Sequence, residues 1–253
     1  MMPATFVLVH GGFHGGWSWR RVADLLSAAG HRVFTPTLTG AGERAHLLSP
    51  SLDFEVYVAD VLGLIEAEEL SEIVLVGHSF GGHVISVIAD RRPELVQRLV
   101  YLDGVMPLPG LMNGKLPEQW KERSDTLISV NGVPCFPVPD PSYFGVTESP
   151  DADWLRRRLT PFPAHLIAAR IELDNQICNG RPRTYVRSLA PLYHSAAVQA
   201  AQDYAATKFE HFIDLPTGHD SMVLMPNEVA TILANSVFAR RSETNATIRS
   251  KQH

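Results

Sequence analysis

The chain has 253 residues and 45% of them are hydrophobic, which is enough to bury one large core or two small ones. Its 22 basic and 27 acidic side chains give a formal net charge of −5 without strong clustering of either sign, which argues against a nucleic-acid partner and against an anionic membrane partner. Two cysteines, Cys135 and Cys178, are too few for a disulfide framework and lack metal-ligand spacing. The N-terminus lacks the basic segment of a signal peptide, so a cytoplasmic protein is predicted.

Short apolar runs alternate with amphipathic stretches in the first part of the chain. Residues 6–9 predict a buried strand, and the glycine-rich segment 10–16 follows it. Residues 17–29 predict a helix, and 32–36 predict a second strand. Residues 54–70 predict another helix, because their apolar side chains recur at the i, i+3, i+4 and i+7 spacing of one helix face.

The next stretch combines a strand, a sharp turn and a helix. Residues 73–76 are an unbroken apolar run, as expected for a parallel strand that is covered on both faces. Residues 77–81, Gly-His-Ser-Phe-Gly, fit the G-x-S-x-G nucleophile elbow, and 82–90 have apolar residues at helical spacing. In this motif the glycines relieve steric crowding around a strained serine, so Ser79 is the candidate nucleophile. The alternative is a glycine-rich turn with an incidental serine.

Later segments continue the alternation. Strands are expected at 98–103, 183–186 and 209–215, and a last helix at 227–239. Because strands alternate with helices and no hairpin signals were identified, the sequence predicts an α/β fold with a mostly parallel six-stranded sheet flanked by helices. The polar segment 240–253 is predicted to be a flexible tail.

A proline-rich segment interrupts this pattern after the fourth strand. It spans 107–181, and a compact α/β core does not need so long a connection between consecutive strands. We expect a cap that is inserted over the sheet edge, while 1–106 and 182–239 form the core. The alternative is an excursion that does not contact the site.

Four polar residues follow predicted strand ends: His10, Ser79, Asp103 and His219. In parallel sheets the carboxyl ends of the strands lie at one edge, where ligands bind, so these residues can converge. A serine nucleophile needs a base within hydrogen-bond reach, and His219 is the best candidate because it follows the last strand. Among the other histidines, His194 is the competitor.

The acid that would orient the base is less obvious. No carboxylate follows the penultimate strand at 183–186, but Asp103 ends the strand after the elbow helix and can reach the same histidine. We therefore expect Asp103 to be the acid. Asp203 and Asp214 are the alternatives, and Asp103 could instead be a structural residue that caps the following loop.

The remaining candidate residues bind the substrate. The backbone N–H groups of Phe80 and Gly12 are expected to form the oxyanion hole. Phe13, which follows the first strand, and Trp120 and Trp154 of the cap are the candidate substrate contacts. The aromatic side chains of the cap suggest an apolar or aromatic pocket. These aromatics could equally pack the cap itself.

Three separated motifs together resemble the α/β-hydrolase superfamily: residues 9–19, 77–82 and 218–222. The most similar branch contains plant methylesterases, hydroxynitrile lyases and bacterial esterases, some of which act on carbamates or pyrethroid-type esters. The resemblance implies a serine hydrolase without cofactor or metal, with Ser79 as nucleophile and His219 as base.

Two departures from that branch affect the interpretation. The plant enzymes carry their acid after the penultimate strand, so the role of Asp103 is inferred from its position alone. The lyases have threonine where Gly11 stands and lysine where Asp220 follows the base, which argues against cyanohydrin chemistry.

The sequence thus predicts a serine hydrolase that cleaves a small apolar or aromatic carboxylic ester, or a carbamate, through an acyl-enzyme. A hydroxynitrile-lyase-like or other non-hydrolytic reaction, and a non-catalytic small-ligand receptor, are the alternatives. The expected partner is a small-molecule ester, and a homodimer is possible.

Overall fold

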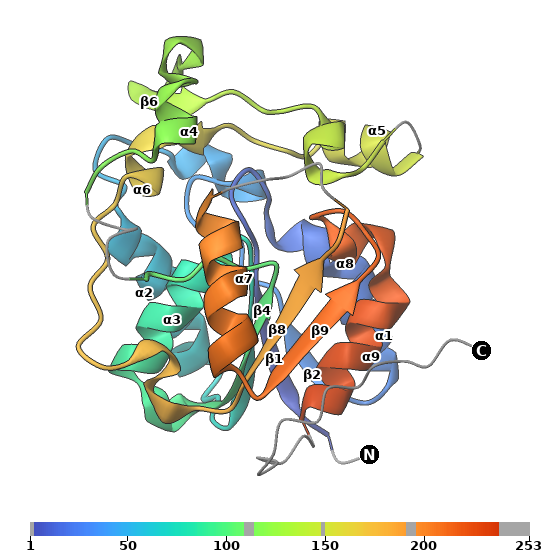
Figure 1. Cartoon of the computed structure of the whole chain (residues 1–253). Helices are drawn as coiled ribbons and strands as arrows, with labels where there is room; N and C mark the ends of the chain where they lie inside the picture. Colours follow the sequence, from blue (N-terminus) through green and yellow to red (C-terminus); the bar gives the residue numbers. More distant parts are fainter. Residues whose placement is uncertain (1–2, 109–113, 148–149, 191–195, 238–253) are drawn as a thin grey trace.

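A six-stranded parallel sheet forms the centre of the computed structural model, which describes residues 3–108, 114–147, 150–190 and 196–237 (Figure 1). All neighbouring strands of this sheet pair in parallel. The predicted α/β fold is therefore confirmed. In spatial order, the strands are β2 (Arg32–Phe34), β1 (Thr5–Val9), β3 (Ile73–His78), β4 (Val96–Leu102), β8 (Arg183–Ser188) and β9 (His211–Leu215).

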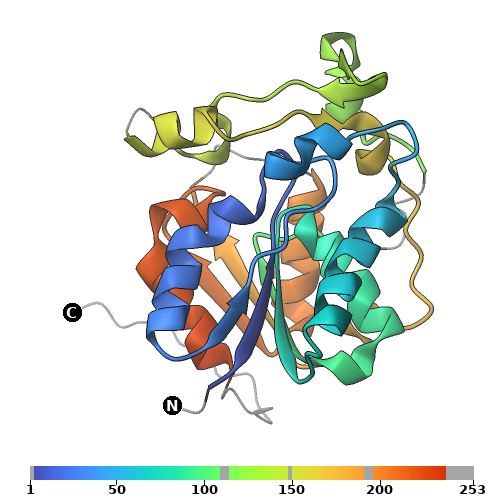
Figure 2. The ribbon, with the colours of Figure 1, turned by 180° about the vertical axis from the view of Figure 1, so that it is seen from behind.

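Helices cover both faces of the sheet, which explains why the central strands are continuously apolar. Every residue of β3 is buried. In Figures 1 and 2, the helices lie in two groups, one against each face of the sheet. One face carries α1 (Arg20–Ala28) and α9 (Pro226–Ser236), and the other carries α2 (Phe54–Ala67), α3 (Gly81–Arg91) and α7 (Ala196–Lys208). None of the described helices is long and apolar enough to cross a lipid bilayer.

The helix α7 was not predicted, although it lies between two predicted strands. Its buried side chains are Val198, Ala201 and Ala205, which have the spacing of one helix face. Two of the three are alanines, so the apolar face is narrow and its periodicity is weak in the sequence. The helix contacts β8 through this face.

The segment between β4 and β8 lies over the carboxyl ends of the parallel strands (Figures 1 and 2). It contains a small antiparallel sheet with the order β5-β6-β7. The expectation that the chain lacks hairpins was wrong here. The elements of this segment are β5 (Ile128–Val130), β6 (Val133–Phe136), β7 (Phe162–Pro163), α4 (Glu118–Lys121), α5 (Pro150–Arg156) and α6 (Ala164–Ile167).

The turn between β5 and β6 explains the hairpin. Val130 pairs with Val133, which leaves Asn131 and Gly132 as a two-residue loop. Their φ values are +51° and +80°. Asn-Gly is the preferred dipeptide for a turn in which both central residues have positive φ, and this signal was present in the sequence.

Candidate active site

Ser79 lies on the turn that joins β3 to α3. Its φ is +49°, in the left-handed region that L-residues rarely adopt. Its backbone N–H donates to the carbonyl oxygen of Leu102 (3.2 Å), and its own carbonyl accepts from Gly82 (3.0 Å) and Val105 (2.9 Å). The neighbouring chain thus holds the strained backbone of Ser79 from both sides, and its side chain lines a pocket.

Asp103 and His219 meet although 116 positions separate them in the chain. His219 Nδ1 donates to Asp103 Oδ2 at 2.7 Å, and both side chains are at most 4% exposed. Asp103 follows β4, and its backbone N–H donates to Val186 of β8 (2.8 Å). Its second carboxylate oxygen accepts from Gln202 Nε2 (3.0 Å) and from the backbone N–H of Ser188 (3.4 Å). The carboxylate is therefore fixed in position on both oxygens.

The alternative acids lie elsewhere. Asp203 is exposed and accepts from Gln199 on its own helix (2.9 Å). Asp214 is exposed in β9 and forms a bidentate ion pair with Arg187 (2.8 Å for both bonds). His194, the alternative base, lies outside the described residues.

His78 connects the loop of His219 to the elbow. Its Nε2 donates to the backbone carbonyl of His219 (3.1 Å), and the two rings lie 4.6 Å apart at their centroids. Because His78 directly precedes Ser79, this contact brings the base loop to the strand end that carries the candidate nucleophile. Phe144 also stacks on the ring of His219, with centroids 6.2 Å apart and an interplanar angle of 21°.

Two histidines hold the loop that carries Gly12, and His10 is one of them. His10 Nδ1 donates to the carbonyl of Gly11 (2.8 Å), and its Nε2 accepts from the backbone N–H of Leu38 (3.0 Å). One nitrogen donates and the other accepts, so the ring is neutral. Burial is the main reason why the pKa of His10 is lowered to about 4.

His14 holds the other side of the same loop. Its Nδ1 faces the carbonyl of Gly12 (2.7 Å), and its Nε2 faces Asp220 Oδ2 (2.9 Å). Both partners are acceptors, so both ring nitrogens must carry protons and the ring is a cation. Burial alone would lower the pKa of His14, but the charge and hydrogen bond of Asp220 and the Gly12 carbonyl outweigh it and raise that pKa. This buried ion pair links the Gly12 loop to the residue after His219.

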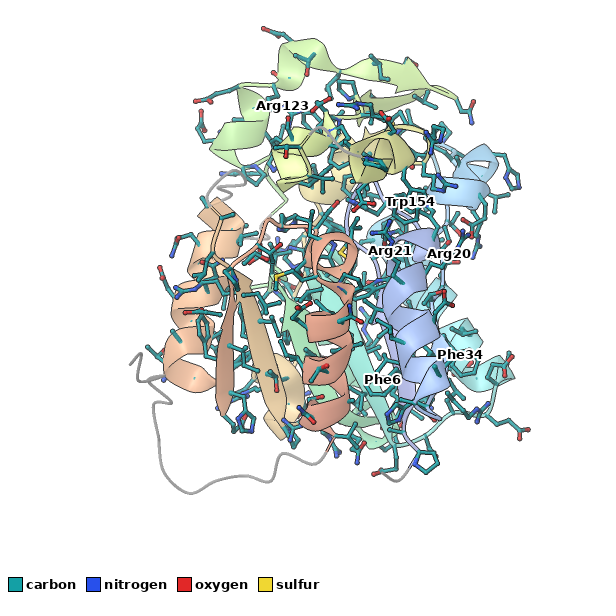
Figure 3. The ribbon with its side chains drawn as sticks, turned by 90° about the vertical axis from the view of Figure 1, so that its right-hand side faces the viewer. Phe6, Arg20, Arg21, Phe34, Arg123 and Trp154 are labelled. Atoms are coloured by element: carbon teal, nitrogen blue, oxygen red, sulfur yellow. The ribbon has the colours of Figure 1, made fainter. Side chains whose placement is uncertain are left out.

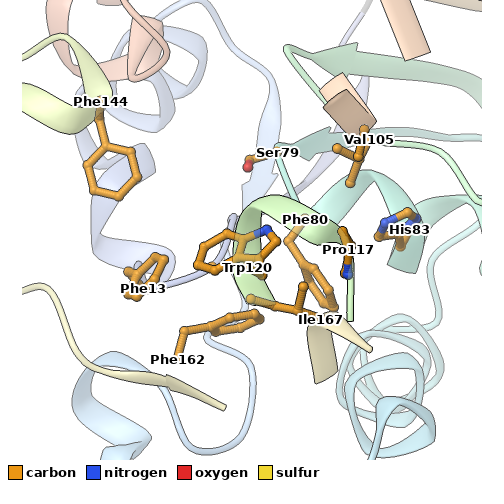
Figure 4. Close-up of a pocket in the computed structure, with 12 residues that line it drawn as sticks. Phe13, Ser79, Phe80, His83, Val105, Pro117, Trp120, Phe144, Phe162 and Ile167 are labelled. Atoms are coloured by element: carbon orange, nitrogen blue, oxygen red, sulfur yellow. The ribbon is translucent and has the colours of Figure 1, made fainter. Parts of the chain in front are cut away.

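A pocket of about 560 Å³, with the space at its mouth included, opens beside Ser79 (Figure 4). Gly12 and Phe80 line it together with Phe13 and Trp120, two of the predicted substrate contacts. The remaining lining residues are His83, Val105, Pro117, Phe144, Phe162, Ile167 and Ala197.

Trp154, the third predicted substrate contact, does not line this pocket. It packs edge-on against Trp17, with ring centroids 4.9 Å apart. The guanidinium groups of Arg21 and Arg158 lie 5.3 and 5.1 Å from its ring centroid. Figure 3 shows Trp154 beside Arg21, between the segment that contains α5 and helix α1. Its aromatic face is thus used to pack these two parts together.

Several lining residues were not predicted as site residues. Phe144 and Phe162 were recognised only as aromatic residues of the predicted cap. His83 was not among the candidate histidines, yet it lines the pocket from the first turn of α3. Its position four residues after Ser79 was the available signal. Within the described residues, no three His, Cys, Asp or Glu side chains are grouped as metal ligands.

The sequence matches the Alpha/beta hydrolase family over residues 6–232. The chain belongs to this family. It is 37% identical, over 252 residues, to the carbendazim hydrolyzing esterase of Nocardioides sp. (strain SG-4G), covering 91% of this chain and 98% of that protein. It is also 34% identical over 120 residues to salicylic acid-binding protein 2 of Nicotiana tabacum, covering 47% of this chain and 46% of that protein.

Solved structures agree with the fold assignment. An extracellular alpha/beta-hydrolase from a Paenibacillus species superposes with a TM-score of 0.75 at 24% identity, covering 92% of this chain and 99% of that chain. A pyrethroid hydrolase from Sphingobium faniae JZ-2 gives a TM-score of 0.71 at 24% identity, covering 93% and 98%. The resemblance inferred from the three sequence motifs is confirmed, and this α/β-hydrolase family member is a carboxylesterase-type hydrolase.

Proposed function

We propose that this hydrolase cleaves a carboxylic ester or a carbamate of a small apolar or aromatic substrate through an acyl-enzyme. The aromatic lining of the pocket beside Ser79 supports a flat or apolar substrate. The 37% identical esterase is named for the hydrolysis of carbendazim, a carbamate. A related carbamate or aryl ester would suit the aromatic and apolar lining of this pocket.

In the proposed mechanism, Ser79 Oγ attacks the substrate carbonyl while Nε2 of His219 accepts its proton. The backbone N–H groups of Gly12 and Phe80 stabilise the oxyanion. His219 then protonates the leaving alcohol, and an acyl group remains on Ser79. Water attacks this acyl-enzyme and gives its proton to His219, which returns it to Ser79 as the acid is released. No cofactor takes part.

The hydrogen bond between Asp103 and His219 is the observation that carries the proposal. An ionised carboxylate only accepts, so the 2.7 Å bond requires the proton on Nδ1 of His219. Nε2 of the neutral ring is then unprotonated and can accept the proton of Ser79. This is the tautomer that a general base for serine needs.

We also propose that residues 107–181 act as the cap of this site. The pocket-lining side chains that this segment contributes support the proposal, as does its position over the carboxyl ends of the strands (Figure 1). Those side chains are Pro117, Trp120, Phe144, Phe162 and Ile167.

No observation favours the lyase alternative. The lyases carry threonine at the position of Gly11, and a Cβ atom there would lie 2.8 Å from Ser79 Cβ and 3.0 Å from His78 Nδ1. Asp220, which takes the place of the lysine of the lyases, is buried in its pair with His14.

Replacing the nucleophile tests the proposal directly. Ser79→Ala is expected to lower kcat for 4-nitrophenyl acetate by about 10⁶-fold, because the attacking oxygen is removed while the binding site remains. A serine-directed phosphonate should label Ser79 in the wild-type protein, as mass spectrometry of the peptides would reveal. Turnover that survives in Ser79→Ala, or a label on another residue, would contradict the assignment.

A further inference from the structure

His83 is a polar residue in an otherwise apolar part of the pocket. Among the described lining residues, only Ser79, His83 and Trp120 have side chains with a polar atom. The His83 ring is 3% exposed and lies edge-on to Phe80, with centroids 5.4 Å apart. In Figure 4, His83 lies beside Pro117, on the opposite side of the view from Phe13 and Phe144, with Ser79 between the two sides.

The ring of His83 is neutral and has a hydrogen bond to offer. Burial lowers the pKa of His83 to about 3, so at neutral pH one ring nitrogen donates and the other accepts. Nδ1 is buried and has no hydrogen-bond partner among the described residues. A buried polar group without a partner is costly, and a pocket that bound only hydrocarbon would be better lined by an apolar side chain here.

We propose that His83 is a specificity-determining residue that hydrogen-bonds a polar atom on the body of the substrate, away from the reacting carbonyl. The substrate class would then be aryl or heteroaryl esters or carbamates that carry a hydroxyl group or a ring nitrogen. This inference rests on the proposed function, because it assigns His83 to the same pocket as Ser79. His83 would then favour substrates that carry a polar group, while the other lining residues favour aromatic substrates.

The position of His83 explains how one substrate can meet both groups. Ser79 immediately precedes α3 in the elbow, and His83 lies in the first turn of that helix. The pocket therefore offers a substrate whose carbonyl is at Ser79 a wall that contains Phe80 and His83. A site built to bond a polar substrate group discriminates strongly against the analogue that lacks it, because its own polar group then stays unpaired.

Pairs of substrates that react equally well but differ in one hydrogen-bonding group can measure the effect of this hydrogen bond alone. We suggest 4-nitrophenyl esters of 3-(hydroxyphenyl)propanoic acid, with the hydroxyl at ring position 3 or 4, where it cannot attack the ester carbonyl itself, each paired with the methyl analogue of the same shape. The two methylene groups insulate the carbonyl from the ring substituent, and the leaving group is the same throughout. The readout is the ratio of kcat/KM for each hydroxyl ester to kcat/KM for its methyl partner.

In the wild-type protein, one hydroxyl isomer is expected to be preferred over its methyl partner by about 10-fold. His83→Leu should lower that ratio to one or below, since the hydroxyl group would then face an apolar wall. His83→Phe keeps a ring against Phe80 and provides the same comparison if the leucine variant does not fold. His83→Gln retains a donor and an acceptor and should restore part of the preference.

Val105→Ala is the matched control, because Val105 also lines the pocket but carries no polar side-chain atom. It should change both rates of a pair alike and leave the ratio unchanged. The inference is overturned if no isomer is preferred, or if the preferred ratio survives in a folded His83→Leu or His83→Phe variant. A wild-type protein that neither hydrolyses these esters nor labels at Ser79 would instead overturn the proposed function.

Discussion

Asp103 accepts hydrogen bonds from three groups, and only one of them belongs to His219. Gln202 of α7 and the backbone of Ser188 hold the other carboxylate oxygen. Asparagine at this position keeps one oxygen that can accept from Gln202 and Ser188, so Asp103→Asn is not expected to disturb the backbone nearby. For this reason, a substitution at Asp103 can separate the orientation of the base from the stability of the fold.

Asp103→Asn is expected to lower kcat by about 10⁴-fold with little change in KM. The amide nitrogen can donate to Nδ1 of His219, which would favour the tautomer in which Nε2 carries the proton and cannot act as a base. Steady-state kinetics with 4-nitrophenyl acetate measure the loss, and circular dichroism monitors the fold. Asp203→Asn is the control, because that exposed carboxylate contacts only its own helix in the described structure and its loss should leave kcat unchanged. Near-normal activity in Asp103→Asn would exclude the assigned role.

The sequence predicts the positions of some site residues but not of others. Asp103 and His219 follow strand ends, so chain order alone predicted that they could approach each other. Trp154 could not be placed in this way, because its contacts with Trp17 and Arg21 depend on how α5 packs against the core. His83 was missed because its place in the pocket depends on aromatic residues from the distant segment that covers it.

At the scale of elements, the elbow is a close crossing of β1, β3 and α3. A Cβ atom on Gly81 would lie 2.7 Å from the carbonyl oxygens of both Val9 and His10. These are backbone atoms, which cannot rotate out of the way as a flexible side chain can. Glycine at position 81 therefore allows α3 to approach the end of β1, and it holds the loop of Gly12 next to Phe80.

Gly81→Ala is accordingly expected to destabilise the protein by about 1–3 kcal/mol and to lower kcat/KM, because α3 must move away from β1. Gly63→Ala is the matched control: Gly63 lies inside α2, and a Cβ atom there meets nothing within 4 Å. This second change should stabilise the protein by about 0.5–1 kcal/mol, since alanine loses less backbone entropy in a helix. Urea denaturation of both variants measures the difference. Equal effects of the two substitutions would refute the close-crossing argument.

Elements were predicted well where their periodicity is strong. The strands of the sheet were all located, although β2 ends at Phe34 and β9 begins at His211, inside the predicted ranges. Helix α7 buries a narrow, alanine-rich face and gives little periodic signal. The β5–β6 hairpin gave a clear local signal at Asn131 and Gly132, but it stood in a proline-rich segment whose composition suggested irregular structure.

At the scale of the whole molecule, the buried histidines couple the stability of the fold to pH. Burial lowers the pKa of His10 to about 4 and that of His83 to about 3, and it lowers the pKa of His78 well below its ordinary value of 6.5. The unfolded chain would bind protons on these rings near pH 6.5, while the folded chain does not. His14 changes the pH dependence of stability in the opposite direction, because its pKa is raised in the folded state.

The sign of the pH dependence follows from these shifts. The stability that His14 contributes is fully present below pH 6.5 and is lost only as the pH rises through its folded pKa. Below pH 6.5, therefore, the pH dependence of stability follows the three neutral histidines. Each lowers the free energy of unfolding by up to about 1.4 kcal/mol for each unit by which the pH falls. Between pH 6 and pH 5, which is still above the pKa values of about 4 and about 3, we expect His10 and His83 together to lower the free energy of unfolding by about 2.5 kcal/mol, and His78 to add to this loss.

Urea denaturation followed by tryptophan fluorescence at a series of pH values measures this slope. His83→Phe removes one of the titrating rings, so the slope between pH 6 and pH 5 should become shallower by about 1 kcal/mol per pH unit. The comparison of slopes is independent of whatever the substitution does to stability at neutral pH, because only the number of protons taken up on unfolding determines it. A free energy of unfolding that stays constant over this range, or a slope that His83→Phe leaves unchanged, would mean that the buried rings already carry protons in the folded protein.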